Sequence, residues 1–448
     1  MKTIAAGALA LGLAILGPPQ APSGSPAPAG APTAATPLPP EVSSWLQSAA
    51  APLATLDPRV DSSDLAPLRT IVGDARIVAL GEATHGSHEF FAFKARAVEF
   101  LVSELGFTDF AMETDWTQAL SVDDFVERGQ GDLDAAVKAL SPLWRTEEYR
   151  GLLEWMRAWN AAPEHLRKVR FHGLDLGAPA LTARRLKEYL ARVEPDVAES
   201  VAPVIERLGS GSSVDEGDLE GLLALFDELK DQFVAHSSER EWALHRQHVV
   251  ILTQTYRQRS KPGNEGTSWR DRCMADNARW ILRQAGPDAR LVLSAHNGHV
   301  SRAGLSEVEG YGTIESIGRA LTADAKTVKD ENLSMVVIGS AFARGSFHSY
   351  GSGLRAFTVG DPRTGSHESA FLAAGLRLAL LDLARAPTSG PVRAWLDTPR
   401  PLRFVGGTFD DSWPEQGNDV QSSRLPAEFD ALFFTAESTP SRLLSPPR

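Results

Sequence analysis

Short apolar runs alternate with longer amphipathic stretches along most of the chain, and this alternation constrains the fold more than any other feature. Runs rich in Val, Ile, Leu and Phe are typical of buried strands, whereas the stretches between them repeat apolar residues at the helical period. The apolar runs span residues 75–82, 107–116, 168–176, 289–300, 334–347, 403–407 and 429–438. Strand and helix in repeated alternation predict an α/β fold with a largely parallel or mixed central sheet flanked by helices.

One long segment, about residues 181–285, interrupts this alternation. It contains "DLEGLLALFDELKDQFVAH" and "EREWALHRQHVVILTQTYRQ", which both have the helical period and have no strand pattern between them. We therefore expect an inserted helical subdomain over the cleft at one end of the sheet. Such an insert either walls a substrate cleft or serves as a structural cap.

The first residues resemble an export signal followed by a linker. Lys2 precedes an apolar stretch from Ile4 to Leu16, and small residues and prolines follow it. We assign residues 1–17 to a signal peptide, residues 18–42 to a Pro/Ala-rich disordered linker, and residues 43–448 to the folded domain. The apolar stretch is short for a membrane span. We expect an exported protein, periplasmic or secreted, without membrane insertion after signal cleavage.

Charge and cysteine content narrow the possible functions. The formal net charge is −12 and the pI is about 5.5, and the chain has no dense cluster of lysine and arginine. Nucleic acid is therefore not an expected partner, because binding it requires a row of cations that neutralise phosphates. The single cysteine, Cys273, excludes an internal disulfide.

Polar and ionisable residues follow four of the predicted strands. In an open parallel sheet, ligands bind at the carboxyl ends of the strands, so residues at these positions are expected to share one site. The residues are Glu82 and His85; Glu113 and Asp115; His172 and Asp175; and His296, Asn297 and His299.

Histidines beside carboxylates suit hydrolysis by an activated water molecule. A carboxylate orients the imidazole and stabilises its protonated form, so the ring can take a proton from water near neutral pH. A second histidine can protonate a leaving alkoxide or bind a developing oxyanion. The G-x-S-x-G motif of serine hydrolases does not occur, and Cys273 lies in a helical stretch that suggests a small buried residue. These residues predict hydrolysis of an ester or lactone, with water as the nucleophile.

Two alternatives use the same residues. Histidines and carboxylates also bind Zn²⁺, which would ionise a bound water, and the spacing of His296 and His299 is compatible with that. However, "HGSHE" matches neither H-E-x-x-H nor H-x-x-E-H. A metal-dependent hydrolase therefore remains an alternative, as does a non-catalytic ligand-binding protein with the same cleft.

Several segments, in order, resemble the erythromycin esterase family. The first is "LGEATHGSHEFFAFKARAVEFLVSELGFTDFAMETDW", and the later ones are "FHGLDL", "RDRCMADNARWIL", "SAHNGHVSR" and "FDALFFTAESTP". The resemblance extends from about residue 65 to residue 440. It implies an α/β core with a helical part, a deep cleft, and hydrolysis of a cyclic ester without a metal or other cofactor.

The resemblance also implies roles for individual residues. Glu82 and His85 match the acidic residue and the essential histidine of the first family motif, Glu113 matches the glutamate that ends the second strand, and His296 matches a later histidine. Lys94 stands where the macrolide-hydrolysing members carry arginine, so the compact ammonium group of lysine replaces the planar guanidinium group of arginine.

We expect His85, oriented by Glu82 or Glu113, to be the general base, and His296 to assist the oxyanion or leaving group. The expected partner is a small-molecule ester or lactone. We expect the substrate-binding residues to be Lys94, Asp115, Asp175, Asn297, His299 and Arg272. Asp271 and Arg272 are expected either to form an ion pair that closes the cleft or to flank a helix start.

Overall fold

The computed structural model describes residues 38–304 and 314–444. The expected signal peptide and residues 18–37 of the expected linker lie outside these residues, so export remains a prediction. Helix α1 (Pro40–Ala49) begins within the expected linker, two residues before its expected end at residue 42, and its Val42 is fully buried. In the part of the chain that is described, no helix has both the length and the apolar character needed to cross a membrane.

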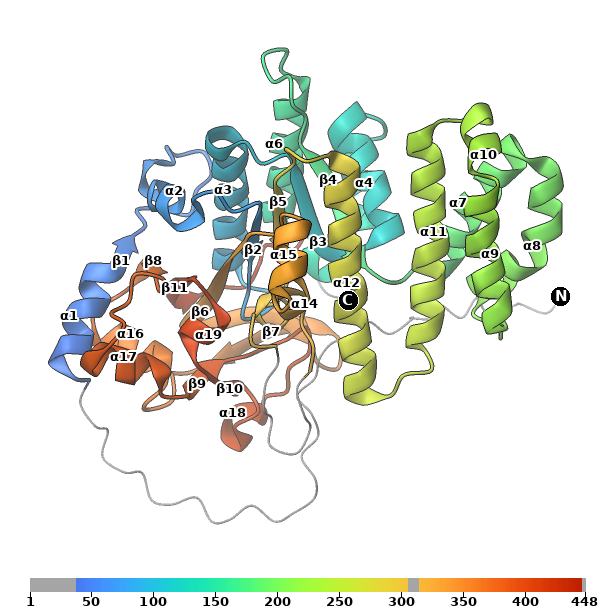
Figure 1. Cartoon of the computed structure of the whole chain (residues 1–448). Helices are drawn as coiled ribbons and strands as arrows, with labels where there is room; N and C mark the ends of the chain where they lie inside the picture. The colour runs from blue at the N-terminus through green and yellow to red at the C-terminus, as the bar shows by residue number, and fades with distance from the viewer. Residues whose placement is uncertain (1–37, 305–313, 445–448) are drawn as a thin grey trace, which may run out of the picture.

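A nine-stranded sheet forms the centre of the molecule (Figure 1). Its central strands run parallel in the order β11-β6-β2-β5-β3-β4. These strands are β2 (Ile77–Leu80), β3 (Asp109–Asp115), β4 (Arg170–Asp175), β5 (Leu291–Ser294), β6 (Met335–Tyr350) and β11 (Ala431–Ser438). Each of them overlaps a predicted apolar run, and the predicted α/β fold with a mixed central sheet is confirmed.

Antiparallel strands extend the sheet at its β11 side and at the far end of β6. Strand β8 pairs with β11, β1 pairs with β8, and β7 pairs with the second half of β6. A separate two-stranded sheet joins β9 and β10. Their bounds are β1 (Ala50–Pro52), β7 (Leu354–Val359), β8 (Leu378–Asp382), β9 (Arg400–Arg403) and β10 (Val420–Ser423).

Helices cover both faces of the sheet, because alternate residues of the central strands are buried on opposite sides. In β2, Val78 and Leu80 belong to one hydrophobic core with helices α2–α6, while Ile77 and Ala79 belong to a second core with α1, α12, α14, α16 and α17. The helices of the first face are α2 (Pro67–Val72), α3 (His88–Leu105), α4 (Trp116–Arg128), α5 (Leu133–Ala139) and α6 (Glu147–Ala161). The later helices are α13 (Asn297–Val300), α14 (Ile317–Thr322), α15 (Ala325–Asp330), α16 (His367–Ala373), α17 (Gly390–Asp397), α18 (Trp413–Gln416) and α19 (Leu425–Glu428).

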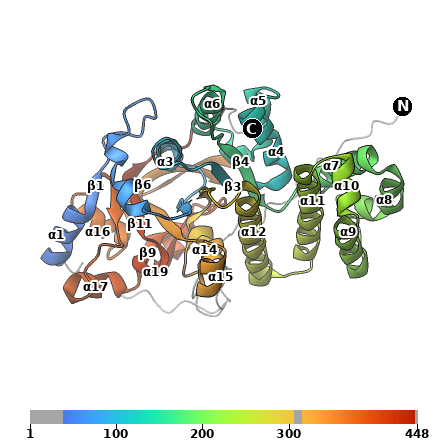
Figure 2. The ribbon, with the colours of Figure 1, turned by 45° about the horizontal axis from the view of Figure 1, so that its top comes forward.

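An unbroken run of helices lies between β4 and β5, where the sequence predicts an insertion. The helices are α7 (Pro179–Val193), α8 (Pro195–Ser210), α9 (Glu216–Glu228), α10 (Lys230–His236), α11 (Glu239–Gln258) and α12 (Gly263–Ala285). Helices α7–α11 bury their apolar faces against one another in a third core. They lie beside the edge of the sheet that carries β4, whereas α12 returns to the sheet (Figures 1 and 2). Of these helices, α12 supplies the side chains that reach the strand ends.

Candidate active site

The first corner of the site lies directly after β2. Gly81 leaves the strand where a side chain would collide with Asn297, since an added Cβ would lie 2.3 Å from Asn297 Oδ1. Glu82 and His85 follow, and Glu82 Oε1 lies 2.6 Å from His85 Nδ1. The ionised carboxylate can only accept, so Nδ1 carries the proton, and Nε2 has no hydrogen-bond partner among the described residues. Of the two glutamates that were expected to orient His85, Glu82 is the one in contact with the ring.

Lys94, on the buried face of α3, holds the other oxygen of Glu82. Its Nζ donates to Glu82 Oε2 at 2.5 Å, to Ser294 Oγ at 3.0 Å and to the Ala295 carbonyl at 3.2 Å. Burial tends to raise the pKa of Glu82, but Lys94 and His85 outweigh burial and lower it. Glu82 is therefore an anion fixed between a cation and an imidazole. Because all three Lys94 protons are used, the expected contact of Lys94 with substrate would require one of these bonds to be given up.

Glu113, at the end of β3, connects two further side chains and one backbone N–H. Its Oε1 accepts from Arg270 Nη2 at 3.0 Å and lies 3.1 Å from His299 Nε2, while its Oε2 accepts from the backbone N–H of His296 at 3.0 Å. Burial acts to raise the pKa of Glu113, but His299 outweighs it and the pKa lies well below the usual range. Glu113 therefore organises the opposite side of the site and does not contact the Nδ1 of His85.

His299 lies between two carboxylates and is an imidazolium. Its Nδ1 is 2.7 Å from Asp271 Oδ1, and its Nε2 faces Glu113. Burial favours the neutral ring, but Asp271 and Glu113 outweigh burial and raise the pKa of His299 to about 10. Arg270 Nη1 lies 3.3 Å from His299 Nε2, a contact between two donors that is tolerated because both cations face Glu113.

Arg270 is a further cation of the site, and the pattern of polar residues at strand ends does not predict it. Its Nε donates to Asp175 Oδ1 at 2.8 Å and its Nη2 to Asp175 Oδ2 at 2.6 Å, so the expected site residue Asp175 is bound in a bidentate pair. Arg272, which was expected at the site, lies on the exposed side of α12, and Asp271 pairs with His299 instead of with Arg272. The sequence does contain a signal for Arg270, namely the helical period. Arg270, Met274 and Ala278 are spaced four residues apart and share the buried face of α12.

His296 contacts the ring of His85 but is itself neutral. The ring centroids lie 5.2 Å apart. Its Nδ1 accepts from the Gly298 N–H at 3.1 Å, so Nε2 carries the proton and faces the Val405 carbonyl at 3.2 Å. Burial, with the neighbouring histidines, lowers the pKa of His296 to about 3. His296 is therefore a neutral hydrogen-bond donor at neutral pH and not a proton source.

Two other expected substrate-binding residues have local structural contacts. Asn297, the first residue of α13, binds β6, because its Nδ2 donates to the Ser340 carbonyl at 2.7 Å and its Oδ1 accepts from the Ser340 N–H at 3.0 Å. Asp115 caps α4 by accepting the Gln118 N–H at 2.7 Å. Its second oxygen is buried without a hydrogen bond to any described residue, and burial raises its pKa to about 7. Asp115 thus has a free acceptor, whereas the amide of Asn297 is occupied.

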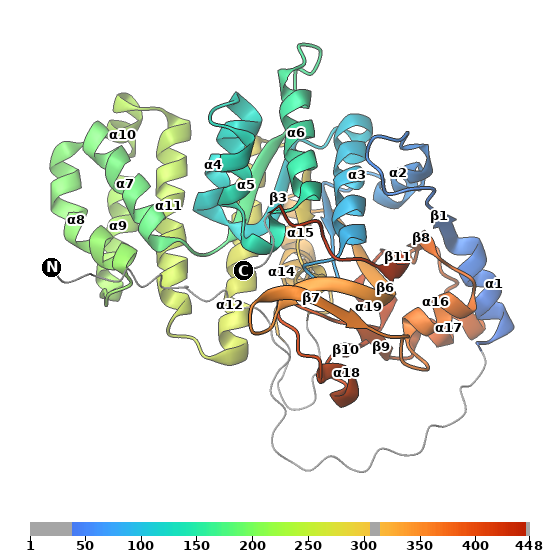
Figure 3. The same cartoon turned by 180° about the vertical axis from the view of Figure 1, so that it is seen from behind.

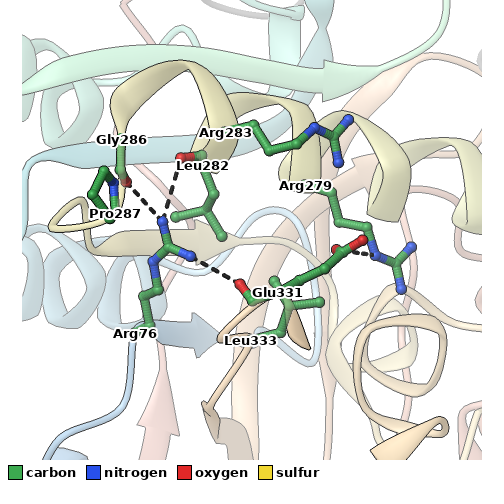
Figure 4. A pocket seen from close by; sticks show the side chains of 8 residues that line it. All are labelled: Arg76, Arg279, Leu282, Arg283, Gly286, Pro287, Glu331 and Leu333. Carbon is green, nitrogen blue, oxygen red and sulfur yellow. Dashed lines mark hydrogen bonds and ion pairs between the residues drawn. The ribbon is translucent and has the colours of Figure 1, made fainter. Parts of the chain in front are cut away.

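The candidate site and a pocket of about 250 Å³ lie at opposite ends of β2. The pocket is lined by Arg76 and Glu331, which precede strands, and by the end of α12 (Figure 4). Arg76 donates to the carbonyls of Gly286 at 2.8 Å and Glu331 at 3.0 Å, so its guanidinium joins chain segments together. Ligands of parallel sheets bind at the carboxyl ends of the strands, where Glu82 and Glu113 lie, and not at this amino end.

Four carboxylates of the site, Glu82, Glu113, Asp175 and Asp271, are each paired with a cation or a histidine. Within residues 38–304 and 314–444, no group of three or more His, Cys, Asp and Glu side chains is arranged to hold a metal ion. Burial, followed by Asp276, raises the pKa of the Cys273 thiol to about 12, so this buried cysteine is a thiol and a poor nucleophile. The site is therefore an arrangement of ion pairs beside one histidine, His85, whose Nε2 has no hydrogen-bond partner in the described part of the chain.

Known proteins resemble this chain in sequence and in fold. The family model described as erythromycin esterase matches residues 102–438. "Erythromycin esterase type II" of Escherichia coli is 23% identical over 368 residues, which is 74% of this chain and 86% of that protein.

Solved structures show the same fold. A Bacillus cereus protein has a TM-score of 0.78 and 27% identity, covering 90% of this chain and 99% of that one. A mutant of the erythromycin esterase EreC in its open conformation has a TM-score of 0.62 and 19% identity, covering 87% of this chain and 98% of that one.

The family match begins after His85 and includes Glu113, Arg270, His296 and His299. The match covers well over half of the chain, and the resemblance in sequence is accompanied by a shared fold over nearly its whole length. The chain therefore belongs to the erythromycin esterase family and is, at that level, an ester hydrolase that acts on a small molecule.

Proposed function

We propose that the protein hydrolyses a carboxylic ester or lactone with a water molecule activated by His85. The observation that supports this most strongly is the 2.6 Å contact between Glu82 Oε1 and His85 Nδ1, which leaves Nε2 as a base. His85 is also less buried than its partner, with 7% of its surface exposed against 1% for Glu82. A base that must accept a proton from water needs this combination of a fixed ring and an accessible nitrogen.

In the proposed reaction, water donates a proton to His85 Nε2 as its oxygen attacks the acyl carbon. The anion of Glu82 stabilises the imidazolium that forms, and Lys94 keeps Glu82 ionised and in position. When the tetrahedral intermediate collapses, the carbon–oxygen bond to the leaving group breaks and His85 returns its proton to the alkoxide. One histidine therefore serves as base and then as acid, and no covalent enzyme intermediate is required.

His296 is proposed to assist the oxyanion by hydrogen bonding. Among the described residues, its Nε2–H contacts only the Val405 carbonyl, at 3.2 Å, and the ring is next to His85. Since its pKa is about 3, the ring stays neutral and can donate a hydrogen bond without giving up its proton. The expected role of His296 is thereby narrowed to oxyanion stabilisation, and protonation of the leaving group is assigned to His85.

A lactone is the proposed substrate class, by analogy with the relatives that are named erythromycin esterases. The test is a panel of chromogenic esters, macrolides and simpler lactones, in which acid release is followed by titration at constant pH. The best substrate is then hydrolysed in water enriched in heavy oxygen, with and without a chelator. We expect heavy oxygen in the product acid after a single turnover, and a rate that does not change with the chelator.

Three outcomes would contradict the proposal. Heavy oxygen in the carboxylate of Glu82 or Glu113 would indicate a covalent intermediate. Stoichiometric bound zinc together with loss of activity to the chelator would indicate a metal-dependent hydrolase. A compound that raises the melting temperature and is never hydrolysed, with no other substrate found, would indicate a ligand-binding protein.

A further inference from the structure

The last described residues, 439–444, cross the amino ends of two helices that flank the site. We call this segment the C-terminal strap. It leaves β11 at Ser438 and runs past α3 towards α6 (Figure 3). The residues matched by the family model end at 438, directly before the strap.

The strap first binds the loop that carries His85. The Ser441 N–H donates to the Gly86 carbonyl at 2.8 Å, and the Thr439 carbonyl accepts the His88 N–H at 2.9 Å. Ser87 and Pro440 form an antiparallel bridge between these two bonds. Gly86 is the residue after His85, so the bond from Ser441 acts one peptide unit away from the proposed base.

The strap then binds the turn that carries Trp144. The Arg442 carbonyl accepts the Glu147 N–H at 2.8 Å, and the Leu444 N–H donates to the Arg145 carbonyl at 2.9 Å. Trp144 belongs to this turn, and its ring meets the ring of His85 edge-on, with centroids 5.6 Å apart. One short segment therefore holds both the backbone beside His85 and an aromatic ring that packs against it.

Side chains link the two halves of this contact. His88 Nδ1 lies 2.6 Å from Glu148 Oε1, and both Glu148 oxygens face the Arg442 N–H, at 3.2 and 3.3 Å. His88 and Glu147 are the first residues of α3 and α6, and first-turn N–H groups have no partner within their own helix. The strap carbonyls supply these partners, which makes the positions of α3 and α6 depend on the strap.

The Gly86 carbonyl is held from two sides. It accepts from the His348 N–H at 2.9 Å as well as from Ser441, and an added Cβ on Gly86 would lie 1.9 Å from the His348 carbonyl oxygen. The far end of β6 thus fixes one side of the loop, and the strap fixes the other. Without the strap, the His348 N–H would still hold the Gly86 carbonyl. The loop that carries His85 could then move only on the side that the strap now occupies.

We propose that the C-terminal strap is a positioning element for His85: it keeps the imidazole against Glu82 and Trp144. This proposal rests on the proposed role of His85 as the base. A strap that served folding alone would contribute to stability without affecting turnover. A positioning strap affects kcat, because a base displaced by a fraction of an ångström loses its alignment with the attacking water.

The test compares Ser441→Pro with Ser441→Ala. Proline removes the N–H that binds Gly86, while alanine keeps that N–H and removes only the hydroxyl, which lies 3.3 Å from His348 Nδ1. We expect Ser441→Pro to lower kcat by roughly ten- to a hundred-fold with little change in KM, and Ser441→Ala to retain wild-type kcat. A second variant ends at residue 438 and receives a synthetic peptide of residues 439–448, which should restore much of the lost kcat.

Hydrogen exchange at residues 81–90 provides a measurement that needs no substrate. We expect faster exchange there in Ser441→Pro and in the shortened chain, and slower exchange again when the peptide is added. If the wild type hydrolyses nothing but exchange responds in this way, the proposed activity fails and the positioning role stands. Wild-type kcat and exchange in Ser441→Pro, or in the shortened chain without peptide, would overturn the proposal.

Discussion

At the scale of single residues, the site depends on which charges are neutralised by partners. Glu82 is paired with Lys94, Glu113 with Arg270 and His299, and His85 retains a free nitrogen. The positions of Glu82, His85, Glu113 and His296 at strand ends could be predicted from sequence, because strand ends meet at one edge of the sheet. The ion pairs among these residues could not be predicted, because they depend on side-chain directions, which sequence periodicity does not report. Arg270 was not predicted because it lies within a helix and not at a strand end, although the helical period does place it on the buried face of α12.

Asp115 gives a prediction about stability and pH. Burial raises the pKa of Asp115 from the usual 3.8 to about 7, while the Gln118 N–H opposes this and Asp175 adds to it. A folded-state pKa above the unfolded value means that the carboxyl costs stability as pH rises from about 4 through 7. Asp115→Asn removes this cost and keeps a helix-capping residue, so we expect it to raise the unfolding free energy at pH 8 by on the order of 2–4 kcal/mol.

Urea unfolding of Asp115→Asn and wild type at about pH 5 and pH 8 measures this difference. The gain should be clearly smaller at the lower pH, because the wild-type carboxyl is then protonated in the folded protein. An equal difference at both pH values would contradict a raised pKa for Asp115.

At the scale of elements, sequence periodicity identified the parallel strands and missed antiparallel ones. Strand β8 was not predicted because residues 370–386 are apolar almost throughout, and a continuous apolar run does not distinguish a short strand from a buried helix. The helical character of the segment between β4 and β5 was predicted from two stretches with the helical period, residues 218–236 and 239–258. The position of these helices beside the sheet could not be predicted, because it follows from the third core that α7–α11 form among themselves.

Two glycines in different elements should respond in opposite ways to alanine. A Cβ at Gly86 would lie 1.9 Å from the His348 carbonyl oxygen, whereas a Cβ at Gly151, on the exposed face of α6, would meet nothing within 4 Å. We expect Gly86→Ala to lower the unfolding free energy by about 1–3 kcal/mol and to reduce turnover. Gly151→Ala should raise the unfolding free energy by about 0.5–1 kcal/mol without an effect on turnover, because alanine favours the helix. Denaturant titration and steady-state kinetics on both variants check this, and a stabilised, fully active Gly86→Ala would contradict the close packing of the loop.

At the scale of the whole molecule, distant parts of the chain converge on one edge of the sheet. Glu82 and Glu113 come from the first third of the chain, and Arg270 comes from α12, the last helix between β4 and β5. His299 lies in α13 after β5, and the strap consists of residues 439–444. The α/β fold brings them together because its parallel strands present their carboxyl ends on the same side. Ion pairs hold the charged side chains of this cluster, and, among the site histidines of the described residues, His85 has a ring nitrogen, Nε2, without a hydrogen-bond partner.

The measurement that tests this account most directly is the kcat/KM of His85→Ala on the best substrate from the ester and lactone panel. Removal of the base should lower kcat/KM by roughly 10²–10⁴. Circular dichroism and the melting temperature should remain close to those of the wild type, because His85 lies at the edge of the cluster and its partner Glu82 keeps Lys94. Wild-type kcat/KM in a folded His85→Ala variant would contradict the claim that His85 activates the water.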